Sequence, residues 1–293
     1  MFDEFKNYLI ETKKREANTA KFYIQDVRQL KAYFSGRDIV TLTTTDIQDY
    51  INALTAKYKP CTVCRKIASL STFYKWAVIA KYCDCSPIYH LNTPGRPRNV
   101  RVPAVTPLPR VCLVPEVLDK VQGAIWSDNN FIRLRDQAMY GLMMFCGIRA
   151  SEVQMAIIDD VNVEYSTITI HRLKRISGSP REITVDMGTS SSAVVAYLHQ
   201  RLAQFPKVPD PALFVNIHGN RISVRSIRRK LGYYASVAGI KLNPTNLVHN
   251  FALQSLKTGI SLTDLHKRLG HSSVLTTREY ISHLGIIGGE PSK

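Results

Sequence analysis

A stretch without hydrophobic periodicity, LNTPGRPRNVRVPAVTPLPR at residues 91–110, separates two parts of this chain that both show helical spacing. Its prolines interrupt helices and its composition is typical of an extended basic connection. The chain has 293 residues and is 45% hydrophobic, which is enough for two separate cores. The sequence therefore predicts two domains, residues 1–92 and 110–293, joined by a linker over 93–109.

The first domain is expected to be entirely helical. Its three clearest amphipathic segments are residues 19–34, 45–56 and 61–80. Thr19 is the predicted N-cap of the first of these. Three cations lie off the apolar stripe of the third helix, where they face either solvent or a phosphate backbone: Arg65, Lys66 and Lys75.

The second domain is expected to be mainly helical with one small antiparallel sheet. RLRDQAMYGLMMFCG has the apolar width of a deeply buried helix that ends near Gly147. Residues 166–172 and 181–185 alternate around a turn rich in Gly and Ser, which is a hairpin signature. Ser223 is placed to cap a helix over 223–238, and three arginines of this helix face outward: Arg225, Arg228 and Arg229.

The formal charge of +16 indicates an acidic partner. A polyanion such as DNA or RNA is favoured, because many Lys and Arg contacts release counterions, and an anionic membrane surface is the rival. No apolar run is long enough to cross a bilayer, and the N-terminus lacks the apolar segment of a signal peptide. We therefore expect a cytoplasmic protein that does not enter membranes.

Four cysteines form a C-x-x-C and a C-x-C pair, a spacing that raises the question of a zinc site. They are Cys61, Cys64, Cys83 and Cys85. The first pair opens a strongly periodic helix, where cysteines commonly serve as small core or surface residues. We expect no metal site and no disulfides.

The segment RLGHSSVLTTREY at residues 268–280 places a histidine and a tyrosine in constrained positions. Gly270 is expected to end a helix in the left-handed conformation, which fixes the direction of His271. Ser272 or Ser273 can start the next helix, in which Thr276 and Glu279 have capping-box spacing. Tyr280 then lies close to His271, although a structural role for both residues stays open on these features alone.

LGHSSVLTTREY, together with GIRASE at residues 147–152, resembles the two most diagnostic boxes of the tyrosine recombinases, the phage-integrase and Xer-type enzymes. TVCRKIASLSTFYKW resembles a helix of their core-binding domain, and the linker and the separations between the boxes also fit. The resemblance implies a two-domain DNA clamp, with a helical core-binding (SAM-like) domain and a mixed α+β catalytic domain carrying a small antiparallel sheet.

The resemblance also implies roles for individual residues. Arg149 matches the first catalytic arginine, whose guanidinium donates to phosphate oxygens and stabilises charge in the transition state, and Glu152 is expected to support it. His271 matches the histidine that hydrogen-bonds the scissile phosphate. Tyr280 matches the nucleophile that forms a 3′-phosphotyrosyl link. One phosphodiester replaces another in this chemistry, so no nucleotide cofactor is expected, and the sequence has no GxxxxGK[ST] loop.

A hairpin lysine completes the implied set. Lys174, in HRLKRISGSP, matches the lysine expected to protonate the leaving 5′ oxygen. Arg172 and Arg175 flank it, so the register of the match stays open. The residues assigned to DNA binding, including two from the linker, are Arg65, Lys66, Lys75, Arg96, Arg98, Arg172, Arg225, Arg228 and Arg229.

The chain departs from the family pattern in NPTNLVHNFA. Thr245 and Val248 stand where relatives carry a histidine and the second arginine of the phosphate clamp. Val248 can donate no hydrogen bond, and losing one such donor costs ~10²–10³ in rate. His249 matches a neighbouring histidine that is common in the family but is not its catalytic one. Lys257, Lys267 and Arg268 are candidate replacements, although each is more simply explained as a surface charge.

Several functions stay open at this point. The first is an active site-specific recombinase, slow or activated by a partner, and the second is a cleavage-deficient DNA-binding or accessory protein derived from one. An altered copy of an active enzyme and a basic RNA- or membrane-binding protein are the others. The resemblance implies that the protein binds duplex DNA with inverted half-sites, as a dimer on each site and as a tetramer in the synapse, where strand exchange passes through a Holliday junction. It also implies a possible accessory or partner recombinase, and association with the nucleoid in a prokaryote. The tail, HLGIIGGEPSK, is expected to make only modest or non-helical contacts.

Overall fold

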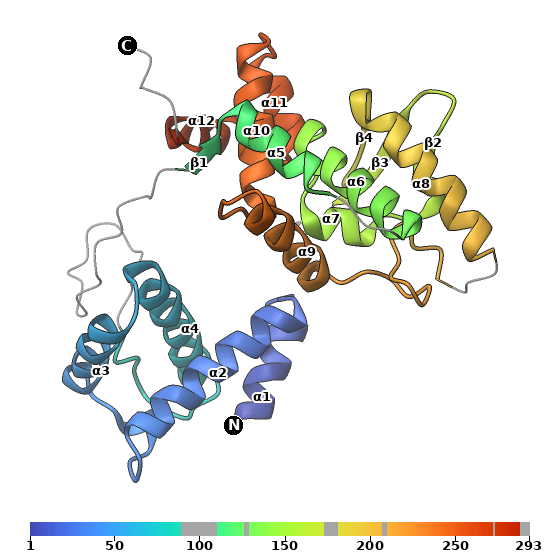
Figure 1. The fold of residues 1–293 in the computed structure, drawn as a ribbon. Coiled ribbons are helices and arrows are strands. Elements are labelled where there is room, and N and C mark those ends of the chain that lie inside the picture. Colours follow the sequence, from blue (N-terminus) through green and yellow to red (C-terminus); the bar gives the residue numbers. More distant parts are fainter. Residues whose placement is uncertain (89–109, 126–128, 173–180, 207–209, 272, 288–293) are drawn as a thin grey trace. The chain divides into compact units, whose positions relative to one another are not determined.

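The structure is a computed structural model that describes residues 1–88, 110–125, 129–172, 181–206, 210–271 and 273–287 (Figure 1). The chain divides into two compact units, residues 1–106 and 107–293. Helices dominate both units, and one three-stranded antiparallel sheet lies in the second, so the predicted fold class is confirmed. The proposed linker, including Arg96 and Arg98, lies outside the described residues.

In its described residues, the first unit has four α-helices packed around a core of aliphatic and aromatic side chains. They are α1 (Phe2–Asn7), which continues into a π-helical turn (Tyr8–Thr12), α2 (Ala17–Tyr33), α3 (Thr44–Lys57) and α4 (Pro60–Ile79), with a 3-10 turn at Ile39–Thr41. Phe5 of α1 packs against Phe73 and Trp76 of α4, with ring centroids 5.3 and 5.2 Å apart. The expected cap is wrong, because α2 begins two residues before Thr19 and its N-cap is Glu16.

A buried ion cluster ties α2 to α4 in this unit. Asp26 is 3% exposed and accepts hydrogen bonds from Arg65 at 2.5 Å, Lys66 at 2.9 Å and Ser69 at 2.8 Å. Burial alone would raise the pKa of Asp26, but these donors hold it below the usual value. Lys66 is itself buried, so the expectation that it is free to meet a phosphate is wrong, because an acid on α2 neutralises it within the core. Lys75 is exposed as expected.

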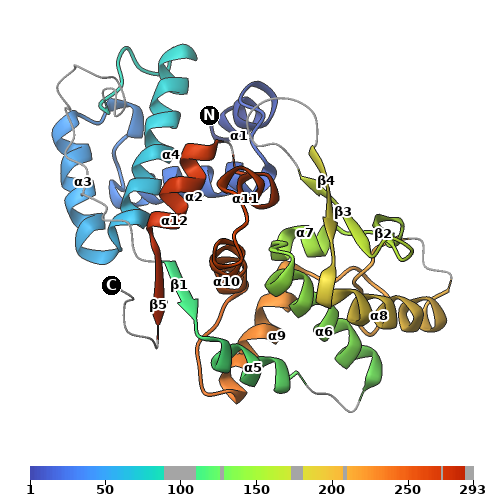
Figure 2. The same cartoon turned by 90° about the horizontal axis from the view of Figure 1, so that it is seen from above.

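The second unit is organised around α6 (Figure 2). Its helices are α5 (Pro115–Gly123), α6 (Asn130–Phe145), α7 (Ala150–Met155), α8 (Ser191–Gln204), α9 (Val224–Val237), α10 (Pro244–Lys257), α11 (Leu262–Leu269) and α12 (Val274–Ser282), with 3-10 turns at Ile158–Asp160 and Gly188–Ser190. Helix α6 packs against α8 and α10, and its wide apolar surface is buried as predicted. In the described part of both units, no helix has the length and apolar character needed to cross a membrane.

Two small sheets complete the second unit. The strands β2 (Val161–Asn162), β3 (Thr167–Arg172) and β4 (Arg181–Asp186) are antiparallel, and Ile170 of β3 lies opposite Ile183 of β4. This is the predicted hairpin. In addition, β1 (Arg110–Leu113) pairs in parallel with β5 (Leu284–Ile287), which follows α12 directly (Figure 2). The start of the second unit is therefore hydrogen-bonded, as a strand pair, to the segment that follows Tyr280 in the same chain.

A glycine turn sets the distance between α6 and α10. Helix α6 ends at Phe145, and Gly147 has a φ of +70°. A Cβ at this position would lie 2.3 Å from the Phe251 ring of α10. Only glycine combines this backbone conformation with so close an approach. The turn leads directly into Arg149, so it also positions one of the candidate catalytic residues.

We predict that Gly147→Ala lowers the free energy of unfolding of the second unit more than the same substitution at Gly239 does. The left-handed backbone alone costs about 1–2 kcal/mol for a residue with a Cβ, and the overlap with Phe251 adds to this. Gly239→Ala is the matched control, because Gly239 has a φ of +74° with no atom within 4 Å of the added Cβ. Chemical denaturation of both variants would measure the difference, and equal losses would show that the Phe251 contact relaxes without cost.

Candidate active site

Four segments of the second unit carry the residues that the sequence singled out. Arg149 precedes α7, Thr245 and Val248 lie on α10, His271 follows α11, and Tyr280 lies on α12. Helix α11 contacts both α10 and α12. Residues more than 100 positions apart in the chain therefore meet at the end of α11.

Arg149 links the start of α7 to the end of α11. Its backbone N–H donates to the Glu152 carboxylate at 2.9 Å, and its guanidinium donates to the same carboxylate at 3.3 Å. The other guanidinium nitrogen donates to the carbonyl oxygen of Leu269 at 2.8 Å. The Arg149 side chain is still 41% exposed, so the held guanidinium stays accessible from solvent. Glu152 has the supporting position that was expected for it.

The turn between α11 and α12 fixes the direction of His271. Gly270 ends α11 in the left-handed conformation with a φ of 64°, as predicted. Ser273 caps α12, and its hydroxyl accepts from the backbone N–H of Thr276 at 3.1 Å. The expected capping box of Thr276 and Glu279 does not form, because Thr276 already lies within the first turn of α12.

A buried threonine constrains the protonation pattern of His271. The Thr277 hydroxyl is fully buried and lies 2.9 Å from His271 Nδ1 and 3.4 Å from His266 Nδ1. A hydroxyl has one proton, so it can donate to one of these nitrogens only. When Thr277 donates to His271, the neutral imidazole carries its proton on Nε2, the nitrogen directed away from Thr277, and can donate that proton to an anion.

Tyr280 lies between two histidine rings. Its hydroxyl is 2.5 Å from Nδ1 of His249 on α10, and the two ring centroids are 5.4 Å apart. The centroid of His271 is 5.1 Å from that of Tyr280. The tyrosine is 8% exposed. The family pattern assigned no catalytic role to His249. Its position four residues after Thr245, on the same face of α10, is a signal in the sequence that points to it.

Comparison with known proteins finds a family match whose range includes Arg149, His271 and Tyr280. Residues 118–284 match the model of the phage integrase family, and residues 2–81 match the phage integrase N-terminal SAM-like domain. The chain belongs to the phage integrase family of tyrosine recombinases. The resemblance inferred from the sequence motifs is thus confirmed.

Relatives of this recombinase align along nearly its whole length. Tyrosine recombinase XerC of Myxococcus xanthus is 28% identical over 289 residues, which cover 96% of this chain and 92% of that protein. Tyrosine recombinase XerD of Listeria innocua is 26% identical, covering 96% and 93%. The crystal structure of XerA recombinase is 25% identical with a TM-score of 0.52, covering 97% of this chain and 93% of that one. XerH bound to difH DNA after cleavage shares the fold, with 18% identity, a TM-score of 0.72 and coverage of 96% and 81%.

Val248 is a buried apolar residue at the position where the sequence resemblance led us to expect an arginine. It is 7% exposed and belongs to a buried cluster with Phe251, Leu265, Leu269 and Tyr280. Thr245, one turn earlier on α10, is exposed. The Val248 side chain therefore belongs to the same buried cluster as Tyr280 and contributes no hydrogen-bond donor.

The lysines considered as replacements for that cation lie at the surface. Lys257, at the end of α10, is exposed. The ammonium of Lys267 is 3.6 Å from the Asp264 carboxylate, and its side chain is 60% exposed.

The structure describes the two strands of the hairpin, β3 and β4, but not residues 173–180 between them. Lys174 and Arg175 lie outside the described residues, as does the side chain of Arg172. At the base, His171 Nε2 is 2.6 Å from Asp160, and Nδ1 is 3.1 Å from Glu182. The hydrogen bond to Asp160 is the main cause that raises the pKa of His171. His171 thus ties β3 to the 3-10 turn that contains Asp160 and to β4, three residues before Lys174 in the sequence.

Several other candidate DNA-binding residues of the recombinase are exposed. The arginines of α9 that were expected to face outward are exposed: Arg225, Arg228 and Arg229. Arg65 is also exposed, although it is paired with Asp26. Within the described ranges, no group of three or more His, Cys, Asp or Glu side chains is placed to hold a metal ion.

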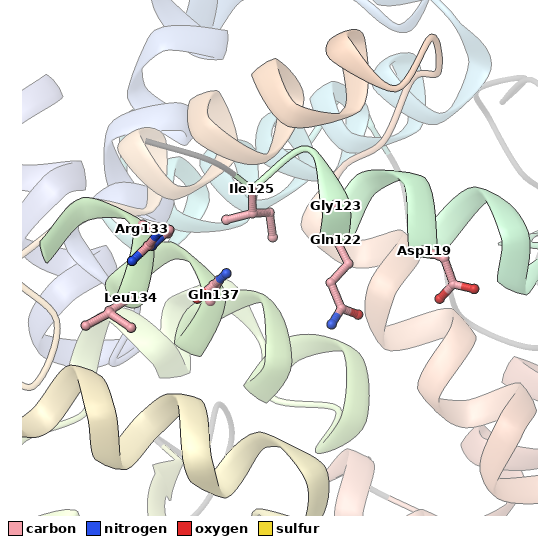
Figure 3. Close-up of a pocket in the computed structure, with 7 residues that line it drawn as sticks. All are labelled: Asp119, Gln122, Gly123, Ile125, Arg133, Leu134 and Gln137. Carbon is pink, nitrogen blue, oxygen red and sulfur yellow. The ribbon is translucent and has the colours of Figure 1, made fainter. Parts of the chain in front are cut away.

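An open hollow of about 590 Å³ lies between α5 and α6 (Figure 3). Polar side chains from both helices line most of it: Asp119, Gln122, Arg133 and Gln137. None of its lining residues belongs to the group around Tyr280. It is a separate surface feature and plays no part in the chemistry proposed below.

Proposed function

We propose that this recombinase cleaves and rejoins duplex DNA at specific sites through a 3′-phosphotyrosyl intermediate on Tyr280. The observation that carries the proposal is the convergence of Arg149, His271 and Tyr280 at the end of α11. Arg149 and His271 donate to phosphate oxygens and stabilise the charge that develops in the transition state. Lys174 protonates the leaving 5′ oxygen.

The two units bind DNA as a clamp, with protomers paired on inverted half-sites and four protomers in the synapse. Related folds support this, because a lambda integrase dimer is bound to a core site and a tetramer to a Holliday junction in solved structures. The charge of +16 and the exposed arginines of α9 supply phosphate contacts. The protein acts in the cytoplasm, at the nucleoid if its source is a prokaryote, alone or with a partner recombinase.

Val248 favours one alternative function. A phosphate clamp without its second arginine loses a charged donor, which is compatible with a protein that binds sites without cutting them. In that case the fold and the DNA-binding cations would be retained, and Tyr280 would not form a covalent bond.

Trapping experiments distinguish these two functions. The protein is incubated with fragments of its own genome that carry nicks or bridging phosphorothiolates, and both the bound and the SDS-resistant fractions are sequenced. Inverted repeats enriched in the SDS-resistant fraction would support the recombinase. The same repeats confined to the noncovalent fraction would support the DNA-binding alternative.

We predict that Val248→Arg raises the rate of covalent attachment, by up to ~10²–10³ if the new guanidinium reaches the phosphate. Val248 is 7% exposed, so thermal unfolding must show that the buried cluster tolerates the charge. Val248→Leu is the matched control, because it changes volume without adding a donor. Unchanged attachment by a folded, DNA-binding Val248→Arg variant would mean that another group completes the clamp.

A further inference from the structure

The Tyr280 hydroxyl has a partner to which the proposed mechanism gives no role. Its oxygen lies 2.5 Å from Nδ1 of His249. The tyrosine as a whole is 8% exposed. A phenol must lose its proton as it attacks phosphorus, and an adjacent base activates such a nucleophile. We propose that His249 is the general base for Tyr280, an inference that rests on the function proposed above.

The surrounding contacts favour His249 over the other histidine near the tyrosine. His271 lies with its ring 5.1 Å from Tyr280, but its Nδ1 is engaged by the Thr277 hydroxyl at 2.9 Å. Its Nε2 is the nitrogen assigned to the scissile phosphate. Thr245 is exposed, and a hydroxyl is a poor proton acceptor at neutral pH. His249 is therefore the side chain placed both to contact the phenol and to hold its proton.

The proton transfer balances over the whole reaction. The phenol O–H donates to the lone pair of His249 Nδ1 in the imidazole that carries its own proton on Nε2. As the tyrosine oxygen bonds to phosphorus, the proton moves to Nδ1, the bond to the 5′ oxygen breaks, and that oxygen takes a proton from Lys174. On rejoining, the 5′ hydroxyl returns its proton, the phosphotyrosyl bond breaks, and Tyr280 recovers its proton from His249.

In this mechanism, the neutral side chain of Val248 has a second consequence, which concerns the charge on His249. The imidazolium formed on His249 is a cation that directly follows the neutral Val248 on α10. The cation also forms close to the reacting phosphate during attack, where it offsets part of the charge that the missing arginine would have met.

The first test measures the single-turnover rate of covalent attachment of the protein to DNA. The substrates are nicked fragments that the trapping experiment recovers in its SDS-resistant fraction. His249→Gln, which keeps a polar side chain but cannot hold the proton, is expected to slow attachment by ~10²–10⁴ and to remove the fall in rate at acidic pH. DNA binding should be unchanged. His199→Gln, at an exposed position of α8, is the matched control and should behave like the wild type. Partial rescue of His249→Ala by added imidazole would separate proton transfer from a packing role.

A second measurement does not depend on activity. In the DNA-free full-length protein, Tyr280→Phe should change the ring ¹⁵N resonances of His249, assigned by their loss in His249→Gln, and leave those of His199 unchanged. If the wild type attaches DNA and His249→Gln keeps its rate and pH dependence, His249 is not the base, although the proposed function stands. If the wild type attaches to no fragment, the proposed function itself fails, and the catalytic role of His249 fails with it.

Discussion

Replacing Tyr280 with phenylalanine is expected to abolish covalent attachment to DNA while leaving DNA binding intact. The substitution removes only the phenolic oxygen, so the ring keeps its place in the buried cluster with Val248 and Leu269. Without that oxygen no phosphotyrosyl bond can form, and the SDS-resistant complex should fall below detection. Denaturing gels of the wild type and the variant on nicked fragments measure this, with a mobility-shift assay for binding.

Tyr233→Phe is the matched control for this experiment. Tyr233 lies on α9 with 59% of its surface exposed, so its hydroxyl is accessible but lies outside the candidate site. Attachment should be unaffected in this variant. If Tyr280→Phe still attached to DNA, the nucleophile would be another residue, and the assignment of the whole site would be wrong.

Arg149→Ala is expected to lower the single-turnover attachment rate by at least ~10²–10³, the usual cost of one lost oxyanion donor. Val248 carries no charge and no hydrogen-bond donor, so it cannot compensate for the loss of the Arg149 guanidinium. Arg149→Lys keeps the charge but not the planar fork, and should recover only part of the rate.

Thermal unfolding must accompany this measurement. Arg149 also donates to Glu152 and to the Leu269 carbonyl, and truncation leaves both acceptors without these hydrogen bonds. Arg133→Ala, in the separate hollow between α5 and α6, is the control for loss of an arginine elsewhere in this unit. A folded Arg149→Ala variant with the wild-type rate would remove Arg149 from the catalytic group.

Local patterns were sufficient for most of the helices and for the hairpin. The spacing of Ile47, Ile51 and Leu54 determined the buried face of α3, and alternation determined the pairing of β3 with β4, because both depend on neighbours in sequence. The left-handed turn at Gly270 was predictable for the same reason. The sequence motifs around Arg149 and Tyr280 were specific enough to indicate the family.

Contacts between distant segments were decided only by the tertiary structure. Nothing near Lys66 in sequence shows that Asp26 of α2 buries and neutralises it, and nothing near Arg110 shows that β1 pairs with β5. The same holds for the site, where His249 and Tyr280 are 31 residues apart and meet because α10 and α12 both pack on α11. By itself the sequence determined most of the elements and the family, and it indicated most of the candidate reacting groups, since these follow from local spacing and residue type. Only the packing of the helices decided which side chain contacts the Tyr280 hydroxyl, because that depends on distances the chain order does not contain.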